Sequence, residues 1–150
     1  MRKIDFPSLY SPGIHEQTMQ QVEGIAVKPF SADIRRQEVW RRFRLLHDTV
    51  TAIVPRCEWY INGSILTTKV GPDDVDASVF IRQSVLSAMS AKERDYLKTL
   101  RDRDSTKLRY LTDFFIESAD DPNRRMYWRG VFGFCHDSIT AKGFVSVQYG

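Results

Sequence analysis

The sequence has little cysteine, no long apolar run and little excess charge, and each shortage removes a class of protein. Its two cysteines, Cys57 and Cys135, have no metal-type spacing and are too few for a disulfide framework. We therefore expect inert thiols in a reducing cytoplasm. No apolar stretch reaches the roughly eighteen residues of a membrane helix, and the N-terminus lacks the apolar core of a secretory signal. We expect no membrane association.

Charge and length restrict the function further. A formal net charge of +3 permits nucleic-acid binding but does not require it, because the excess is small for 150 residues. The sequence contains no internal repeat, no Walker-type glycine loop and no arrangement typical of a serine or cysteine nucleophile. With 42% hydrophobic and 12% aromatic residues, the chain is expected to form a single globular domain over residues 1–150.

Two aspartates separated by one residue are the most informative feature that is present. Asp74 and Asp76 would lie on one face of a strand, because side chains alternate with a period of two, and both could bind one metal ion. Mg²⁺ takes oxygen ligands and is usually held by one or two carboxylates plus substrate phosphates. Upstream, Gly63 would let the backbone approach a phosphate closely, and Ser64 offers N–H and O–H donors. The pattern predicts a site for Mg²⁺ or Mn²⁺ and a nucleoside triphosphate.

A purely structural interpretation of the same residues is a turn followed by a strand, since Gly71 and Pro72 precede the acidic pair. The composition of the next segment favours the metal site. The pair opens the apolar run 75–81, where an aspartate costs β-propensity and desolvation unless something compensates for it. A bound metal ion would do so.

The order of three sequence blocks is similar to that in small stand-alone nucleotidyltransferase-like proteins of the polymerase β superfamily, an uncharacterised bacterial and phage family. The blocks are Pro12-Gly13-Ile14-His15, Gly63-Ser64 through Lys69 to Asp74-Val75-Asp76, and Tyr127-Trp128-Arg129-Gly130-Val131-Phe132-Gly133-Phe134. This resemblance covers most of the chain. It implies a nucleotidyltransferase-like fold and an ancestral nucleotidyltransferase site.

The resemblance implies a third carboxylate on a strand beside the acidic pair. Asp113 is the best match because it stands ahead of an apolar run, and Glu117, on the same strand face, is the fallback. Asp74 and Asp76 would then hold the metal ions. Asp113 would complete the site and help to activate the attacking hydroxyl group. An aspartate exposed at a strand edge is the structural alternative for Asp113.

The phosphate-binding part of the site is less specific. The resemblance assigns Gly63 and Ser64 to the β- and γ-phosphates, with Ser64 expected at a helix N-terminus. Lys69 could reach the triphosphate or could be an ordinary solvated charge. Arg129 is kept as a candidate contact to a phosphate of the nucleotide. Its aromatic neighbours Tyr127, Trp128, Phe132 and Phe134 are expected to pack against the core.

Periodicity and turn residues predict an α/β (α+β) fold, a small mixed β-sheet flanked by helices. One amphipathic helix is marked by the apolar residues Val39, Phe43, Leu46, Val50 and Ile53. The predicted helices cover residues 15–22, 32–54, 82–89 and 90–100, and the predicted strands cover 57–61, 75–81, 108–116 and 143–147. Residues 101–104 are expected to be a surface segment, and residues 120–123 a turn.

The long helix also carries the arginines Arg35, Arg36, Arg41, Arg42 and Arg44. A solvated helix face is favoured over a nucleic-acid surface, because arginine is a good helix former and neighbouring acids temper the charge. Trp40, beside them, is expected in the core.

Three functions remain open. The first is a magnesium-dependent nucleotidyltransferase that moves a nucleoside monophosphate from an NTP to a hydroxyl group on RNA or protein, in keeping with the toxin–antitoxin or phage-defence setting of relatives of this shape. The second is a catalytically inactive nucleotide- or partner-binding protein, antitoxin-like, of the same fold. The small size favours it, because an active enzyme would need a homodimer or partner protein to complete its cleft. The third is an RNA-binding module that uses the arginines.

Overall fold

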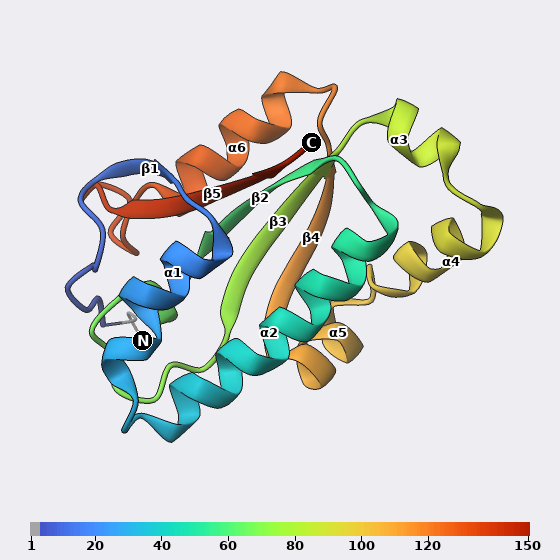
Figure 1. Ribbon diagram of the computed structural model, residues 1–150. Coiled ribbons are helices and arrows are strands. Elements are labelled where there is room, and N and C mark those ends of the chain that lie inside the picture. The colour runs from blue at the N-terminus through green and yellow to red at the C-terminus, as the bar shows by residue number, and fades with distance from the viewer. Residues whose placement is uncertain (1–3) are drawn as a thin grey trace.

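The computed structural model describes residues 4–150 as a five-stranded mixed β-sheet with α-helices on both faces (Figure 1). The mixed α and β architecture predicted from the sequence is confirmed. None of the helices in residues 4–150 is long and apolar enough to cross a membrane. In chain order the elements are β1 (Gly13–Glu16), α1 (Met19–Ala26), η1 (Lys28–Phe30), α2 (Ile34–Ile53), β2 (Cys57–Asn62), η2 (Ser64–Leu66), β3 (Val75–Ile81), α3 (Gln83–Ala88), α4 (Ala91–Thr99), α5 (Arg103–Tyr110), β4 (Thr112–Ser118), α6 (Pro122–Phe132) and β5 (Gly143–Tyr149).

The strand order in the sheet is β1-β5-β2-β3-β4. Strand β2 runs antiparallel to both of its neighbours, β3 and β5. The two outer pairs, β3 with β4 and β1 with β5, are parallel. A parallel pair needs a crossover connection, and the helices α3, α4 and α5 form the one between β3 and β4. The starts of β3 and β4 therefore lie side by side.

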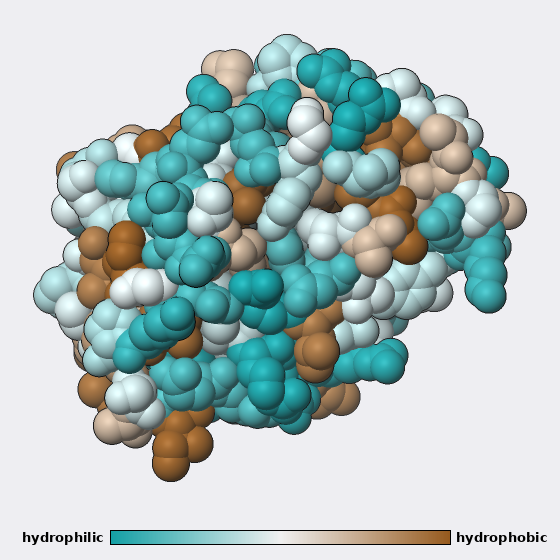
Figure 2. Space-filling view, in the orientation of Figure 1, coloured by the Kyte–Doolittle hydropathy of each residue, from teal (hydrophilic) through white to brown (hydrophobic). Residues whose placement is uncertain are grey.

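Helix α2 crosses one face of the sheet and forms the larger core with it (Figure 1). Its N-terminus is capped by the Asp33 carboxylate, which accepts a hydrogen bond from the Arg36 backbone N–H at 3.1 Å. The predicted apolar stripe is confirmed. Val39, Phe43, Leu46 and Val50 are completely buried, and Ile53, at the end of the helix, is partly buried against the same core. Trp40 is also in this core. The outer surface along α2 is mostly hydrophilic (Figure 2), as expected for an amphipathic helix.

Helix α6 covers part of the opposite face with a smaller aromatic core. The buried members of this cluster are Tyr60, Phe80, Ala119, Trp128, Phe132 and Phe144. The prediction that Trp128 and Phe132 pack inside is confirmed. The same prediction is wrong for Tyr127 and Phe134, whose side chains are 52% and 41% exposed. Only one side of α6 faces the sheet, so the neighbours Tyr127 and Trp128 cannot both be buried, and Phe134 lies beyond the end of the helix.

The helix predicted over residues 15–22 is wrong in its first half. Residues Gly13–Glu16 form β1, and α1 begins only at Met19, after a capping box in which Thr18 and Gln21 bind each other's backbone N–H groups. Strand β1 exists because it pairs with β5, which lies at the other end of the sequence. No local pattern could reveal that pairing.

The strand predicted over residues 108–116 also begins too early. Residues 108–110 end helix α5, whose N-cap is Asp102, so the predicted surface segment 101–104 actually starts a helix. Leu111 adopts a left-handed conformation, φ 50° and ψ 41°, and ends the helix just before β4. A non-glycine residue in this region is uncommon, which explains why the boundary was missed.

Other boundaries agree with the sequence prediction. Helix α2, the strands β2, β3 and β5, and the capping box of Ser90 and Glu93 at α4 lie where they were expected. The turn predicted over residues 120–123 extends too far, because α6 begins at Pro122 with Asp121 as its N-cap.

Candidate active site

Three aspartates meet where β3 and β4 begin, and we refer to Asp74, Asp76 and Asp113 as the acidic corner. Asp76 and Asp113 are directly paired across the parallel strands β3 and β4. Asp74 lies one residue before β3. The side chains of Asp76 and Asp113 point to the α6 face of the sheet, because their neighbours in sequence, Val75 and Phe114, belong to the α2 core.

Gly63 brings the backbone of the preceding turn against this corner. A Cβ atom at this position would lie 3.3 Å from both the backbone nitrogen and Oδ2 of Asp76, and 3.5 Å from the Asp74 carbonyl oxygen. Its φ of 112° is also one that side chains with a Cβ rarely adopt. A residue other than glycine would therefore crowd the Asp76 carboxylate. Ser64 follows and opens the 3₁₀ helix η2, so its predicted place at a helical N-terminus agrees with the structure.

The Asp76 carboxylate is electrostatically strained. Burial is the largest cause that raises its pKa, and the charges of Asp74 and Asp113 raise it further, to about 7; Lys142 and Lys107 act in the opposite direction. Within residues 4–150 only burial and charges at a distance act on this carboxylate, and no hydrogen-bond donor contacts it. The protein therefore holds an acidic group in a place where its ionised form is disfavoured.

The other two carboxylates are held by cations from helix α5. Lys107 Nζ lies 3.0 Å from Asp74 Oδ2. The hydrogen bond to Asp74 raises the pKa of Lys107, and the charges of Asp113 and Asp76 add to that effect. Arg103 binds Asp113 in a bidentate manner, with Nη2 3.0 Å from each carboxylate oxygen, and its guanidinium lies 4.7 Å from the centre of the Phe115 ring.

The acidic corner has the ligand chemistry of a site for a hard cation, although not a preformed one. Carboxylate oxygens are the ligands that Mg²⁺ and Mn²⁺ prefer. Among residues 4–150, no three Asp, Glu, His or Cys side chains are arranged as a ready-made metal site. Asp74 and Asp113 are instead paired with Lys107 and Arg103. The carboxylate oxygens fit a divalent cation once the side chains of Lys107 and Arg103 turn away from them.

The remaining predicted residues lie outside the acidic corner. Lys69 Nζ contacts Asp73 Oδ2 at 3.0 Å, next in sequence to Asp74. Arg129, on α6, donates from Nε to the hydroxyl group of Tyr60 at 3.2 Å. Glu117 shares the sheet face of Asp113, as predicted, but lies farther along β4 and is bound by Arg124. None of these three side chains contacts the carboxylates of the corner.

The sequence analysis missed the cations that accompany the acidic corner. Arg103 and Lys107 are four residues apart and therefore lie on one face of α5. That spacing was a usable signal, but the sequence prediction has a surface segment over residues 101–104 and a strand from residue 108, with no helix that would join the two cations. Lys142, which lowers the pKa of Asp76 through its charge, stands just before β5 and has no local signal.

Comparison with known proteins identifies a family but no activity. A family model described as "Family of unknown function (DUF6932)" matches residues 4–148. That segment contains Gly63, the acidic corner and both α5 cations. Neither the curated proteins nor the solved structures gave a match.

Proposed function

We propose that the chain, which belongs to the family of unknown function DUF6932, is a nucleotidyltransferase. With Mg²⁺ or Mn²⁺ it would move a nucleoside monophosphate from an NTP to a hydroxyl group on RNA or protein. The observation that carries this proposal is the Asp76 carboxylate, which is packed against the glycine turn, lies near two more carboxylates and has no direct partner among residues 4–150. A divalent cation would compensate for that arrangement.

The reaction requires little covalent participation by the protein. The acceptor hydroxyl oxygen forms a bond to the α-phosphorus, the bond from this phosphorus to the bridging oxygen breaks, and pyrophosphate leaves with the bonding electrons. Such a transfer depends mainly on positioning and charge neutralisation. A bound divalent cation would neutralise the phosphates and orient the reacting oxygens.

Each predicted residue then has a definite task. Asp74 and Asp76 hold the cation. Asp113 completes the site and helps to orient the acceptor hydroxyl group and remove its proton. Gly63 permits close approach of the triphosphate, and the Ser64 hydroxyl group donates to it.

Two basic side chains would support phosphate binding. Lys69 supplies positive charge beside the β- and γ-phosphates once it releases Asp73. Arg129 is a further candidate for a phosphate contact, from the α6 side of the sheet.

The cytoplasm is the proposed compartment, in keeping with the two free cysteines. A toxin–antitoxin or phage-defence setting rests on the resemblance alone.

The direct test is a labelling experiment. Purified protein is incubated with each α-labelled NTP, Mg²⁺ and either total cellular RNA or cell lysate. We expect one NTP to label an acceptor, and we expect loss of labelling with chelator. In parallel, that NTP should raise the melting temperature only when the divalent cation is present, because carboxylates and triphosphate repel each other without it. Absence of both labelling and thermal shift for all four nucleotides would refute the proposal.

A second candidate is a nucleotide- or partner-binding protein of the same fold without turnover, acting with a second copy or another protein. The observation in its favour is that Lys107 and Arg103 already neutralise two of the three carboxylates. This candidate predicts a nucleotide-dependent thermal shift without labelling of any acceptor. The third candidate, an RNA-binding module, predicts RNA affinity that falls with salt and survives chelation.

A further inference from the structure

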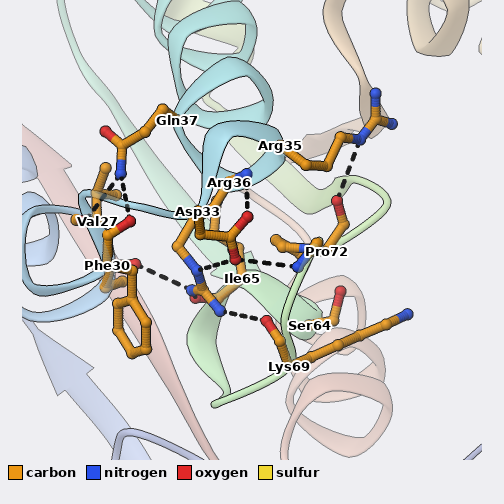
Figure 3. Close-up of polar contacts among 12 residues, drawn as sticks. Val27, Phe30, Asp33, Arg35, Arg36, Gln37, Ser64, Ile65, Lys69 and Pro72 are labelled. Atoms are coloured by element: carbon orange, nitrogen blue, oxygen red, sulfur yellow. Dashed lines mark hydrogen bonds and ion pairs between the residues drawn. The ribbon is translucent and has the colours of Figure 1, made fainter.

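The loop between Ser64 and Asp74 joins the two halves of the candidate active site, and it follows the N-terminus of α2 closely. One side chain of that helix, Arg36, is completely buried although it is charged. Figure 3 shows its polar contacts. Burying a guanidinium group is costly unless its N–H groups are hydrogen bonded and its charge is compensated. Its partners therefore show what it contributes.

Arg36 donates almost entirely to backbone carbonyl groups. Nη1 donates to Ala26 at 3.0 Å and, at a shorter distance, to Ile65. Nη2 donates to Thr67 at 2.8 Å and to Lys69 at 2.7 Å. Three of the four acceptors, at positions 65, 67 and 69, belong to the loop. A single planar group thus fixes alternate carbonyl groups where η2 ends and the loop continues.

The compensation for the charge comes from the same end of the helix. Asp33 Oδ2 lies 3.5 Å from Arg36 Nε and also accepts the Gly71 N–H at 3.0 Å. The Phe30 ring lies 4.2 Å from the centre of the guanidinium. Arg35 continues the pattern by donating to the carbonyl oxygen of Asp73 at 2.8 Å and to that of Pro72 at 3.4 Å. The start of α2 therefore holds the loop from position 65 to position 73 (Figure 3).

We propose that Arg36 is a positioning residue for phosphate binding, because it fixes the path that carries Ser64 and Lys69 at defined places relative to Asp74. This inference rests on the proposed function. If this position only filled the core, an apolar side chain would suffice. Arg36 instead donates most of its hydrogen bonds to the loop that links the phosphate-binding turn to the carboxylates. Substrate affinity, more than the chemical step, depends on it.

The test compares two substitutions of Arg36 with a matched control on the same helix. Arg36→Lys keeps the charge and can satisfy fewer carbonyl groups, and Arg36→Met removes the charge. The control is Trp40→Phe, one turn further along α2, since Trp40 is buried and bonds Glu23 outside the loop. Each protein is assayed for its fold by circular dichroism, for amide hydrogen exchange in residues 65–73, and for KM and kcat in NTP transfer.

We expect Arg36→Met to raise the KM for NTP at least tenfold, with a smaller change in kcat, and to accelerate exchange of the loop amides. Arg36→Lys should recover part of both effects, and Trp40→Phe should show neither. If Arg36→Met does not fold, Arg36→Lys and Asp33→Asn decide the question. The inference is overturned if the loop amides exchange faster while the KM stays unchanged, or if Trp40→Phe raises the KM equally. Wild-type protein that neither binds nor transfers any NTP would instead refute the proposed function.

Discussion

The two faces of the sheet use the same strands for different purposes. Along β3, the residues Val75, Ala77, Val79 and Ile81 face α2 and are all buried in the larger core. The alternate residues Asp76, Ser78 and Phe80 face the α6 side, and only Phe80 belongs to the smaller core there. One face is therefore apolar along its whole length, whereas the other is apolar at one end and polar at the end where the strand begins.

This difference shows how a small domain can contain a strained acidic group without losing its fold. The α2 face supplies most of the buried apolar surface, which is the main stabilising contribution. The α6 face can then leave Asp76 without a direct partner. Because strand side chains alternate, the two roles are separated by one residue in sequence and by the thickness of the sheet in space.

The largest expected effect breaks the apolar face. Phe43→Ala removes a completely buried ring from α2 and should lower the free energy of unfolding by about 3–5 kcal/mol through the cavity that it leaves. Urea denaturation measures this loss. Ile34→Ala is the control on the same helix, since Ile34 is 83% exposed and its loss should change stability by less than about 0.5 kcal/mol. Equal losses for both variants would contradict the assignment of the core.

The next effect breaks the polar face while it spares the fold. Asp76→Asn keeps the side-chain size and removes the charge, so nucleotide transfer should fall by roughly 100-fold or more. Labelling of the identified acceptor measures it. Ser78→Ala is the control on the same face of β3. The Ser78 hydroxyl group is buried without a hydrogen-bond partner in the part of the chain that the structure describes, so its removal should leave both transfer and stability intact. An Asp76→Asn protein with full activity would exclude Asp76 as a metal ligand.

A third prediction uses pH to sharpen the contrast between the faces. Because the folded-state pKa of Asp76 is raised from 3.8 to about 7, the folded protein binds a proton that the unfolded chain has released within this range. The free energy of unfolding from this group is therefore greatest below about pH 4 and falls as the pH rises towards 7. Urea denaturation across that range should show this slope in the wild type and lose it in Asp76→Asn. If the free energy of unfolding changed with pH equally in both proteins, the raised pKa assigned to Asp76 would be wrong.

The smallest effect concerns the cations of the polar face. Lys107→Met removes the ammonium group from Asp74, so the acidic corner should bind Mn²⁺ several-fold more tightly, a gain of about 1 kcal/mol or less for a partly exposed pair. Calorimetric titration of the nucleotide-free protein measures it. Lys92→Met, at an exposed position of α4, should leave the affinity unchanged. Weaker binding in Lys107→Met would show that Lys107 supports the cation site.

The parts of the fold that depend on local patterns could be predicted from the sequence. Helix α2 followed from its apolar stripe, and α4 from the Ser90 capping box. Strand β1 could not, because it exists only through its pairing with β5. The end of α5 depends on the left-handed conformation of Leu111, a residue type that rarely adopts it.

The candidate site divides in the same way. The alternation rule correctly placed Glu117 on the sheet face of Asp113, and the resemblance placed Asp113 beside Asp76 on a neighbouring strand. The spacing of Arg103 and Lys107 could have indicated a shared helix face, but their ion pairs depend on how α5 returns to the sheet, which no local pattern shows. Arg36 was misjudged for a related reason. Its helix position indicated a solvated or nucleic-acid-binding surface, whereas the loop after η2 folds over it and buries it.

The position of β5 in the sheet determines when the molecule can assemble during synthesis. This strand is the last in chain order, yet it lies between β1 and β2. Among the strands of residues 4–150, β1 pairs with β5 alone. It must therefore stay unpaired until residues 143–149 have been synthesised and have joined β2. Such long-range closure slows folding, so β1 is expected to enter the sheet late.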